Sequence, residues 1–354
     1  MSYHQMPISF QQKELDEYLI TAEKNDKFSG TVLVAKQGHI LLHKGYGKAN
    51  YELNVANTTQ TVHRIGSLTK QFTAAAILQL QECGLLSVNN SIGHYLPNYP
   101  QEIANKVIIH HLLIHDSGIP EHTNLPEIMD TRSCKLSIQD IVSTFCNEPL
   151  LFQPGEGHSY SNSNYILLGL IIEKVSNLPY DLYIKENIFK PLGMKASNYD
   201  CSQKIISNRA SGYSLDDSNE RINAKFIDMS LPYAAGGILS TAEDLYKWDQ
   251  ALYGETILQK GSIDMMFFPH TPTDEPNLAY GYGWCVSFLT EKNPTNNPPF
   301  NQRCYHTGCI DGFRSIMARY LSKKICIIIL SNNQQAPIKQ LENELATILF
   351  GYSR

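Results

Sequence analysis

Strand-forming segments lie near both ends of this chain, and helical patterns fill its middle. Residues 30–36 and 39–45 flank Gln37-Gly38, which is the pattern of a β-hairpin. Further strand patterns lie near the C-terminus, at 281–288, 304–307, 314–321 and 325–331. We therefore predict an α+β fold with one antiparallel sheet built from both ends of the chain, flanked by helices, and with an all-α insertion.

Amphipathic helices are predicted at residues 11–24 and 336–350, beside the strands that form the sheet. The chain of 354 residues has the length and composition of a protein with a large core. We predict a single folded unit over 1–354. Its α/β subdomain covers about 10–83 plus 226–354, and its all-α subdomain covers about 84–225.

Ser67 and Lys70 form the one Ser-x-x-Lys pattern in the sequence. Residues three apart on a helix lie on the same face, so a lysine amine can contact the serine hydroxyl without help from the rest of the fold. A serine nucleophile needs such a base. By chance, however, a chain of this length contains about one such pattern, usually on a solvated helix face.

The surroundings of Ser67 favour a chemical role. Residues 72–80 are apolar and rich in alanine, as in a buried helix, and Gly84 is a suitable helix end. Gly66 permits a sharp turn before Ser67, which would then lie at the helix N-terminus. A lysine at the start of a buried helix is costly unless it has partners.

Tyr160 and Asn162 follow a loop rich in proline and glycine and precede an apolar helix. This Tyr-x-Asn pattern occurs once in the chain, and its simplest explanation is a loop with a helix cap. A tyrosine near a lysine ammonium has a lowered pKa, because the phenolate is stabilised. We therefore expect that Tyr160 could accept the proton of Ser67.

His306, Thr307 and Gly308 follow a short strand pattern, and further glycines come after them. We expect this segment at the end of a strand, where glycine would let a substrate lie against the backbone as an added strand. Taken alone, the segment is equally consistent with an ordinary strand end.

The motifs Ser67-x-x-Lys70, Tyr160-x-Asn162 and His306-Thr307-Gly308, in this order, resemble those of the serine β-lactamase/penicillin-binding-protein superfamily. The nearest group in it includes class C β-lactamases, DD-carboxypeptidases with a His-Thr-Gly motif, family VIII-type esterases and D-aminopeptidases. The resemblance covers nearly the whole chain and implies the β-lactamase/DD-peptidase-like fold. Further matching segments are 111–118, 235–245, 282–284 and 312–315.

The resemblance implies a role for each motif residue in a serine hydrolase. Ser67 would be the acylated nucleophile, and Lys70 with Tyr160 would form the proton network that His306 helps to polarise. Asn162 would orient the substrate amide and Lys70. The remaining implied substrate-binding residues are Thr307, Gly308 and Cys309, and the backbone N–H of Cys309 would form an oxyanion hole with that of Ser67. No metal or organic cofactor is implied.

Other sites were weighed against this hypothesis. His111 and His115 have the i, i+4 spacing of metal ligands on a helix, but Leu112 breaks the His-Glu-x-x-His pattern. Residues 157–161 nearly match the Gly-x-Ser-x-Gly elbow of α/β-hydrolases, with serine in the last position. Cys309 is a possible thiol nucleophile without an evident base. A binding or sensing protein that keeps the fold without turnover is also open.

Bulk properties exclude several classes of partner. The net charge of -5 is spread along the chain, and no basic block or finger motif suggests nucleic acid. The longest apolar runs are too short to span a bilayer. The eight cysteines contain no Cys-x-x-Cys pair. Several lie in apolar runs, where a cysteine acts as a small apolar side chain, and this favours a protein from a reducing compartment.

Residues 1–10 lack the features of a secretory signal peptide. We expect a cytoplasmic protein, or a periplasmic or secreted one if a signal has been removed. The expected partner is a small molecule, a short peptide or an ester.

The predicted substrate class stays broad. Amides and esters of the DD-peptidase, esterase and D-amino-acid amidase types all suit these residues, with a weak class C-like β-lactamase as an alternative. His306 carries less positive charge at neutral pH than a lysine would, which weakens the case for an efficient β-lactamase. Arg303 and Arg314 could supply that charge.

Overall fold

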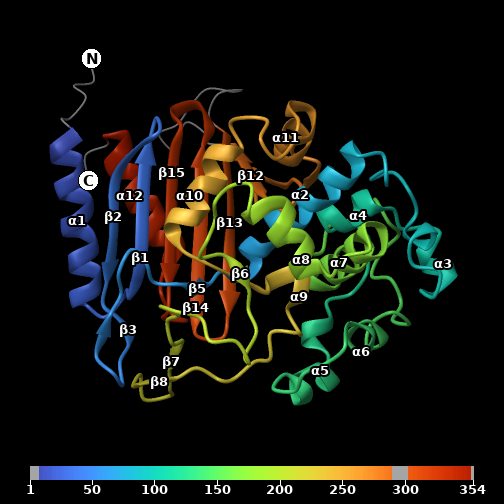
Figure 1. Ribbon diagram of the computed structural model, residues 1–354, viewed down its shortest axis with the longest axis horizontal. Helices are drawn as coiled ribbons and strands as arrows, with labels where there is room; N and C mark the ends of the chain where they lie inside the picture. The colour runs from blue at the N-terminus through green and yellow to red at the C-terminus, as the bar shows by residue number, and fades with distance from the viewer. Residues whose placement is uncertain (1–7, 289–301, 352–354) are drawn as a thin grey trace.

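The computed structural model describes residues 8–288 and 302–351, apart from a few side chains within these ranges. It contains one eight-stranded antiparallel sheet in the order β10-β11-β12-β13-β14-β15-β1-β2, so strands from the two ends of the chain lie side by side (Figure 1). The predicted α+β fold, with one antiparallel sheet built from both ends of the chain, is confirmed. No helix among the described residues has the length and apolar character to cross a bilayer.

The helices and strands have the following bounds. The α-helices are α1 (Ile8–Lys24), α2 (Thr69–Glu82), α3 (Gln101–Ala104), α4 (Ile109–Ile114), α5 (Pro126–Thr131), α6 (Ile138–Ser143), α7 (Asn162–Ser176), α8 (Tyr180–Ile184), α9 (Tyr233–Gly236), α10 (Ala242–Ala251), α11 (Lys260–Phe267) and α12 (Ile338–Phe350). The strands are β1 (Gly30–Lys36), β2 (His39–Tyr46), β3 (Lys48–Asn50), β4 (Val55–Ala56), β5 (His63–Arg64), β6 (Asn198–Tyr199), β7 (Tyr213–Leu215), β8 (Arg221–Asn223), β9 (Ile238–Ser240), β10 (Thr271–Pro272), β11 (Leu278–Tyr280), β12 (Cys285–Phe288), β13 (Gln302–Ile310), β14 (Phe313–Tyr320) and β15 (Ile325–Ser331). Shorter helical turns are η1 (Gly66–Leu68), η2 (Ile92–His94), η3 (His122–Asn124), η4 (Lys185–Phe189) and η5 (Leu321–Lys323).

The central strands are buried on both faces, and alternate residues serve two cores. Val32, Val34 and Ile327 belong to the core formed with α1 and α12. Leu33 and Ile328 belong to the core that continues into the helical part of the molecule. This division follows from the two-residue period of a strand. In Figure 1, α1 and α12 lie on one side of the sheet and α2, α4 and α7 lie beyond its other side.

The hairpin of β1 and β2 follows the predicted turn. Gln37 and Gly38 both have positive φ, of 53° and 81°. Two such residues match the right-handed twist of the flanking strands.

The helical middle of the chain extends to η4 and ends at Phe189, before the predicted limit at residue 225. Residues 198–223 include the short strands β6, β7 and β8. β6 pairs with β9, which also pairs with β5 just before Ser67. These strands are two or three residues long and depend on partners far away in the sequence, so a local pattern does not reveal them.

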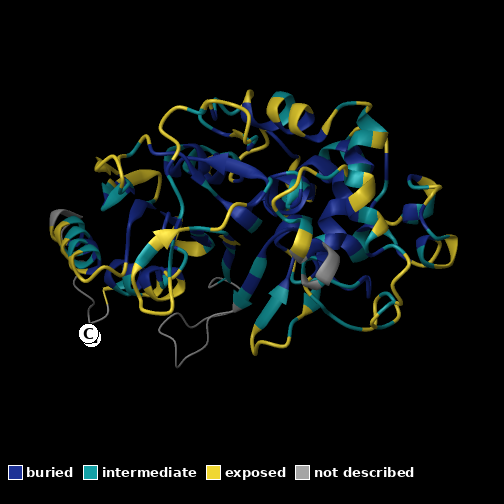
Figure 2. Cartoon of the chain, turned by 90° about the horizontal axis from the view of Figure 1, so that it is seen from below, coloured by how far each residue is buried: buried dark blue, intermediate teal, exposed yellow. Residues whose placement is uncertain are grey.

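The helix α10 begins at Ala242. Thr241 is its N-cap, and its side chain accepts a hydrogen bond from the backbone N–H of Asp244. Ser240 ends β9 and is buried, with its hydroxyl bonded to Ser197. All eight cysteines are free, and Cys304 and Cys326 are buried. Figure 2 shows buried residues along the sheet and the adjoining helices.

Candidate active site

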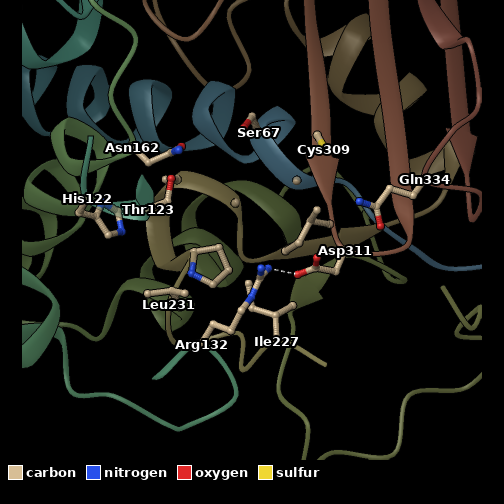
Figure 3. A pocket seen from close by; sticks show the side chains of 15 residues that line it. Ser67, His122, Thr123, Arg132, Asn162, Ile227, Leu231, Cys309, Asp311 and Gln334 are labelled. Carbon is tan, nitrogen blue, oxygen red and sulfur yellow. Dashed lines mark hydrogen bonds and ion pairs between the residues drawn. The ribbon is translucent and has the colours of Figure 1, made fainter. Parts of the chain in front are cut away.

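Ser67 lies in the single turn η1, which leads directly into α2. Gly66 has a φ of +52°, as the sharp turn predicted before Ser67 requires. A Cβ atom on Gly66 would lie 2.9 Å from the backbone nitrogen of Cys309. Glycine is therefore needed here both for its conformation and for the close approach of the Ser67 turn to β13. Figure 3 shows Ser67 and Cys309 on neighbouring elements at one end of a pocket.

Gly308 holds the same two elements together. A Cβ atom at this position would lie 2.0 Å from the carbonyl oxygen of Ile65. That carbonyl also accepts a hydrogen bond of 2.7 Å from the hydroxyl of Ser315 on β14. Glycine is therefore required here for packing against Ile65, and its part in the approach of a substrate stays a prediction. Gly308 lets β13 contact the backbone just before the nucleophile.

The His306-Thr307-Gly308 segment lies within β13 rather than at its end, because β13 continues to Ile310. β14 pairs with β13 as far as Ile310, whereas the register with β12 ends at Tyr305. In this register, residues 306–310 have no strand partner on the β12 side. An extended substrate can add to an open edge of this kind through backbone hydrogen bonds.

Lys70 contacts three oxygen atoms in a buried position. Its Nζ lies 3.2 Å from Ser67 Oγ, 2.7 Å from Asn162 Oδ1 and 2.9 Å from the carbonyl oxygen of Ala235. The last two oxygens can only accept hydrogen bonds. A neutral amine has two N–H groups and one lone pair. When those N–H groups bond Asn162 and Ala235, the lone pair is directed at the hydroxyl of Ser67.

The protonation of Lys70 fits the task of a base. Burial lowers the pKa of its amine to about 7, and the negative charge of Glu121 partly opposes this effect. A base with a pKa near the working pH combines a useful neutral fraction with a strong driving force for proton transfer. The structure thus brings Ser67 and Lys70 together, as the motif predicts.

Tyr160 lies beside this pair, and its ring centroid is 4.9 Å from Lys70 Nζ. Burial raises the pKa of its phenol, although a hydrogen bond to Ser67 opposes that shift. The prediction of a lowered tyrosine pKa is therefore wrong. It assumed a lysine charge that burial makes unfavourable. Tyr160 keeps its proton at neutral pH, which suits it to donate rather than to accept.

Glu121 was not found by sequence reasoning, and it organises this part of the site. Its carboxylate accepts hydrogen bonds from the backbone N–H and the side-chain amide of Asn162. It also accepts bonds from the N–H and the hydroxyl of Thr123. Burial by itself would raise the pKa of Glu121, but neighbouring His122 and these hydrogen bonds lower it, so the carboxylate is charged. No spacing pattern links Glu121 to the motifs.

His306 is buried, and its hydrogen bonds define its tautomer. Nδ1 lies 2.7 Å from the carbonyl oxygen of Thr307, so this nitrogen donates. Nε2 therefore accepts from the hydroxyl of Tyr280, at 2.8 Å. Burial and the nearby Lys70 lower the pKa of His306 to about 3. The ring is neutral at physiological pH, and its centroid lies 6.2 Å from that of Tyr160.

His115 holds the loop on both sides of Tyr160. Its carbonyl oxygen accepts from the N–H of Ser159, and its Nδ1 accepts from the N–H of Ser161. Its ring centroid lies 4.4 Å from that of Tyr160. His115 has a φ of +63° and ends α4. Sequence reasoning considered it as a metal ligand, but the described residues contain no group suited to hold a metal ion.

The pocket beside Ser67 has a volume of about 230 Å³. Asn162, Cys309 and Asp311 line it, together with apolar side chains such as Leu231. Neither Tyr160 nor His306 belongs to the lining of this pocket. The loop at 157–161 has no preceding strand, so the α/β-hydrolase elbow is not formed.

A family model for Beta-lactamase matches residues 17–348. The chain belongs to the beta-lactamase family. Penicillin-binding protein 4* from Bacillus subtilis is 33% identical over 360 residues, which cover 96% of this chain and 76% of that protein. Family membership therefore rests on nearly the whole chain and not on three short motifs.

Solved structures confirm the predicted β-lactamase/DD-peptidase-like fold. The octameric penicillin-binding protein homologue from Pyrococcus abyssi has a TM-score of 0.84 and 28% identity, over 96% of this chain and 77% of that one. The D-amino acid amidase from Ochrobactrum anthropi SV3, solved with L-phenylalanine amide, has a TM-score of 0.82. It is 22% identical, over 96% of this chain and 98% of that one, and so shows a shared fold.

Proposed function

We propose that this beta-lactamase-family protein is a serine hydrolase that forms an acyl-enzyme at Ser67 on an amide or ester. The observation that carries the proposal is the set of hydrogen bonds around Lys70. In its neutral form, the amine bonds Asn162 and Ala235 and directs its lone pair at Ser67. A serine hydroxyl with such a base in place is an activated nucleophile.

Acylation then follows from the positions of these groups. Ser67 Oγ attacks the carbonyl carbon while its proton passes to Lys70 Nζ. The backbone N–H groups of Ser67 and Cys309 stabilise the oxyanion of the tetrahedral intermediate. As the intermediate collapses, the bond to the leaving group breaks, and Tyr160 donates the proton that the leaving group needs. Lys70 returns its proton to Tyr160, and water later releases the acyl group.

The acyl part of the substrate occupies the pocket beside Ser67. Ser67 lines this pocket, whereas Tyr160, which serves the leaving group, does not. Its volume of about 230 Å³ suits a compact acyl group such as an amino-acyl residue. Asn162 offers a side-chain amide at its wall, and the free edge of β13 offers backbone groups to an extended substrate.

The absence of charge on His306 bears on which substrate class the site prefers. The Lys-Thr-Gly version of this motif places a cation where this chain has an uncharged, buried imidazole. An efficient β-lactamase must attract the carboxylate of its substrate. We therefore place the chain with the His-Thr-Gly group, as a peptidase, esterase or D-amino-acid amidase. The D-amino acid amidase of the same fold supports this choice.

The test is covalent labelling followed by mass spectrometry of the labelled peptide. A fluorophosphonate or a fluorescent penicillin should label Ser67, and Ser67→Ala should lose both labelling and turnover while its circular dichroism stays unchanged. Ser218→Ala, which changes an exposed serine between β7 and β8, is the matched control. Hydrolysis at the original rate by a folded Ser67→Ala protein would refute the proposal, and absence of labelling by every acyl donor would favour a binding protein.

A further inference from the structure

A second cavity adjoins the catalytic pocket. Its volume is about 640 Å³, and Asp311 lines both cavities. Residues close together in the sequence also line the two cavities, Arg64 the second and Ser67 the first. Asp311 is therefore the point past which a long acyl group would extend from the first space toward the second.

Two arginines in its wall share one carboxylate. Arg64 Nε lies 2.8 Å from one oxygen of Asp200, and Arg209 Nη1 lies 3.2 Å from the other. The Asp200 side chain is fully buried, whereas those of Arg64 and Arg209 are 14% and 33% exposed. Arginine stays charged at any physiological pH. One carboxylate neutralises one guanidinium, so a full positive charge is left over at the cavity wall.

The other charges of the wall have the same sign or are already paired. Lys204 and Lys225 also line the cavity. Asp311 is its one acidic residue among the described lining residues, and it pairs with Arg132 (Figure 3). We call this space, lined by Arg64, Lys204, Arg209 and Lys225, the basic cavity. A concave site lined by one sign of charge concentrates the field and attracts counter-ions.

We propose that the basic cavity binds an anionic group, a carboxylate or a phosphate, at the far end of the acyl part of the substrate. This inference rests on the proposed function, because the acyl part reaches the cavity only if Ser67 is acylated from that side. Guanidinium groups bind carboxylate and phosphate through paired hydrogen bonds. The preferred substrates would then be acyl donors whose acyl part carries a negative charge far from the bond that is cleaved.

A purely structural role for the arginines makes a different prediction. Arg64 alone would neutralise Asp200, and its guanidinium also lies 5.9 Å from the ring of Phe313. If Arg209 and the lysines served only solubility or packing, the charge at the end of an acyl chain would have no effect on turnover or binding.

The test uses p-nitrophenyl esters of N-acylglycine, which carry no stereocentre. One series ends in a carboxylate (N-glutaryl and longer homologues) and the matched series ends in the isosteric amide (N-glutaramoyl and its homologues). We expect the acid to have a kcat/KM about tenfold higher than the amide at low ionic strength for at least one chain length. The ratio should fall toward one above 0.5 M salt, because salt screens the attraction. A second arm replaces the carboxylate by a phosphate monoester of similar length and separates the two anions.

Two variants test whether the preference for the acid comes from the basic cavity. Arg209→Gln and Lys225→Gln should each lower the acid-to-amide ratio by at least threefold, whereas Lys260→Gln, which removes a charge from α11, should retain it. The two variants lie on different segments, so a folding defect in one leaves the other informative. Equal kcat/KM values for acid and amide at every length, or a ratio insensitive to both variants, would overturn the inference and leave the proposed function intact.

A binding measurement with unreactive ligands distinguishes failure of the anion site from failure of the proposed function. Titration calorimetry should show N-glutarylglycinamide binding at least threefold more tightly than N-glutaramoylglycinamide, and Arg209→Gln should abolish that difference. If this result is found but neither ester acylates Ser67, the proposed function fails and the anion site stands. If the two unreactive ligands bind equally, the anion site is refuted whatever the esters do.

Discussion

Replacing Glu121 by glutamine should shift the acidic limb of the pH profile to lower pH. Protonated Lys70 cannot accept a proton, so kcat/KM should fall as pH drops through the pKa of about 7. The charge of Glu121 raises this pKa and so opposes the effect of burial. Its removal favours the neutral amine, and the limb therefore moves down in pH. The variant should retain a larger fraction of its maximal activity at pH 6 than the original protein.

The size of the shift can be worked from the contacts. Asn162 bridges the two groups, with 2.7 Å from its Oδ1 to Lys70 Nζ and 3.2 Å from its Nδ2 to Glu121 Oε1. The two charges are therefore within about 8 Å, where Coulomb's law gives about 2 kcal/mol at an effective dielectric constant of 20 and about 0.5 kcal/mol in water. At 1.36 kcal/mol per unit, the pKa should fall by about 0.4 to 1.5 units.

The assay is kcat/KM from pH 5 to 9 with an ester that has no ionisable group, since this ratio reports the free enzyme. Each profile is normalised to its own plateau, because the loss of a hydrogen bond to Asn162 will also lower the maximal rate. Glu121→Asp keeps the charge and should keep the limb within about 0.3 units. Glu186→Gln removes an exposed carboxylate on η4 and controls for net charge. An upward shift or an unchanged limb in Glu121→Gln would refute Lys70 as the titrating base.

Three further outcomes test other contacts. His115→Asn should retain kcat within about tenfold, because asparagine tolerates positive φ and can accept from Ser161, whereas His115→Phe leaves that buried N–H unpaired at about 1–3 kcal/mol and should lower kcat further. Gly308→Ala should lower kcat/KM at least about 100-fold, the scale of a lost oxyanion donor, because its Cβ would displace the turn that carries Ser67. Asp249→Ala leaves Arg319 buried without its carboxylate and should lower the free energy of unfolding by about 3–5 kcal/mol in denaturant titrations. A change below 1 kcal/mol in the last case would contradict that value.

The parts of the fold that sequence could predict are those governed by local rules. The hairpin turn at Gln37-Gly38 needs two residues that tolerate positive φ, and the strand patterns on either side have the period of a sheet. The short strands β6 and β9 are different, because their pairing joins residues about 40 positions apart through two or three residues each. The start of α10 also depends on distant pairing. Ser240 and Thr241 are both suitable caps by residue type, but the pairing of β9 places Ser240 in a strand and leaves the cap to Thr241.

In the candidate site, too, contacts between residues close in sequence could be predicted and contacts between distant residues could not. Three-residue spacing on a helix was enough to bring Lys70 to Ser67, and the structure confirms that contact. Glu121 approaches Asn162 from a loop 41 residues earlier, so no spacing rule could reveal it. The expected sign of the Tyr160 pKa shift was wrong because the surroundings of its phenol group disfavour the phenolate, although the residue as a whole is 39% exposed. A buried amine loses the charge that would have stabilised a phenolate.

The same burial assigns the acid and the base of the proposed reaction. Removing water disfavours the charged form of each group, which for Lys70 is the ammonium and for Tyr160 is the phenolate. The two pKa values therefore move apart, downward for the amine and upward for the phenol. Groups whose surroundings separate their pKa values in this way define the acid and the base of a site. At neutral pH the site then holds a base beside Ser67 and a proton donor on the leaving-group side. Both are in the form that acylation requires, without a charged residue at position 306.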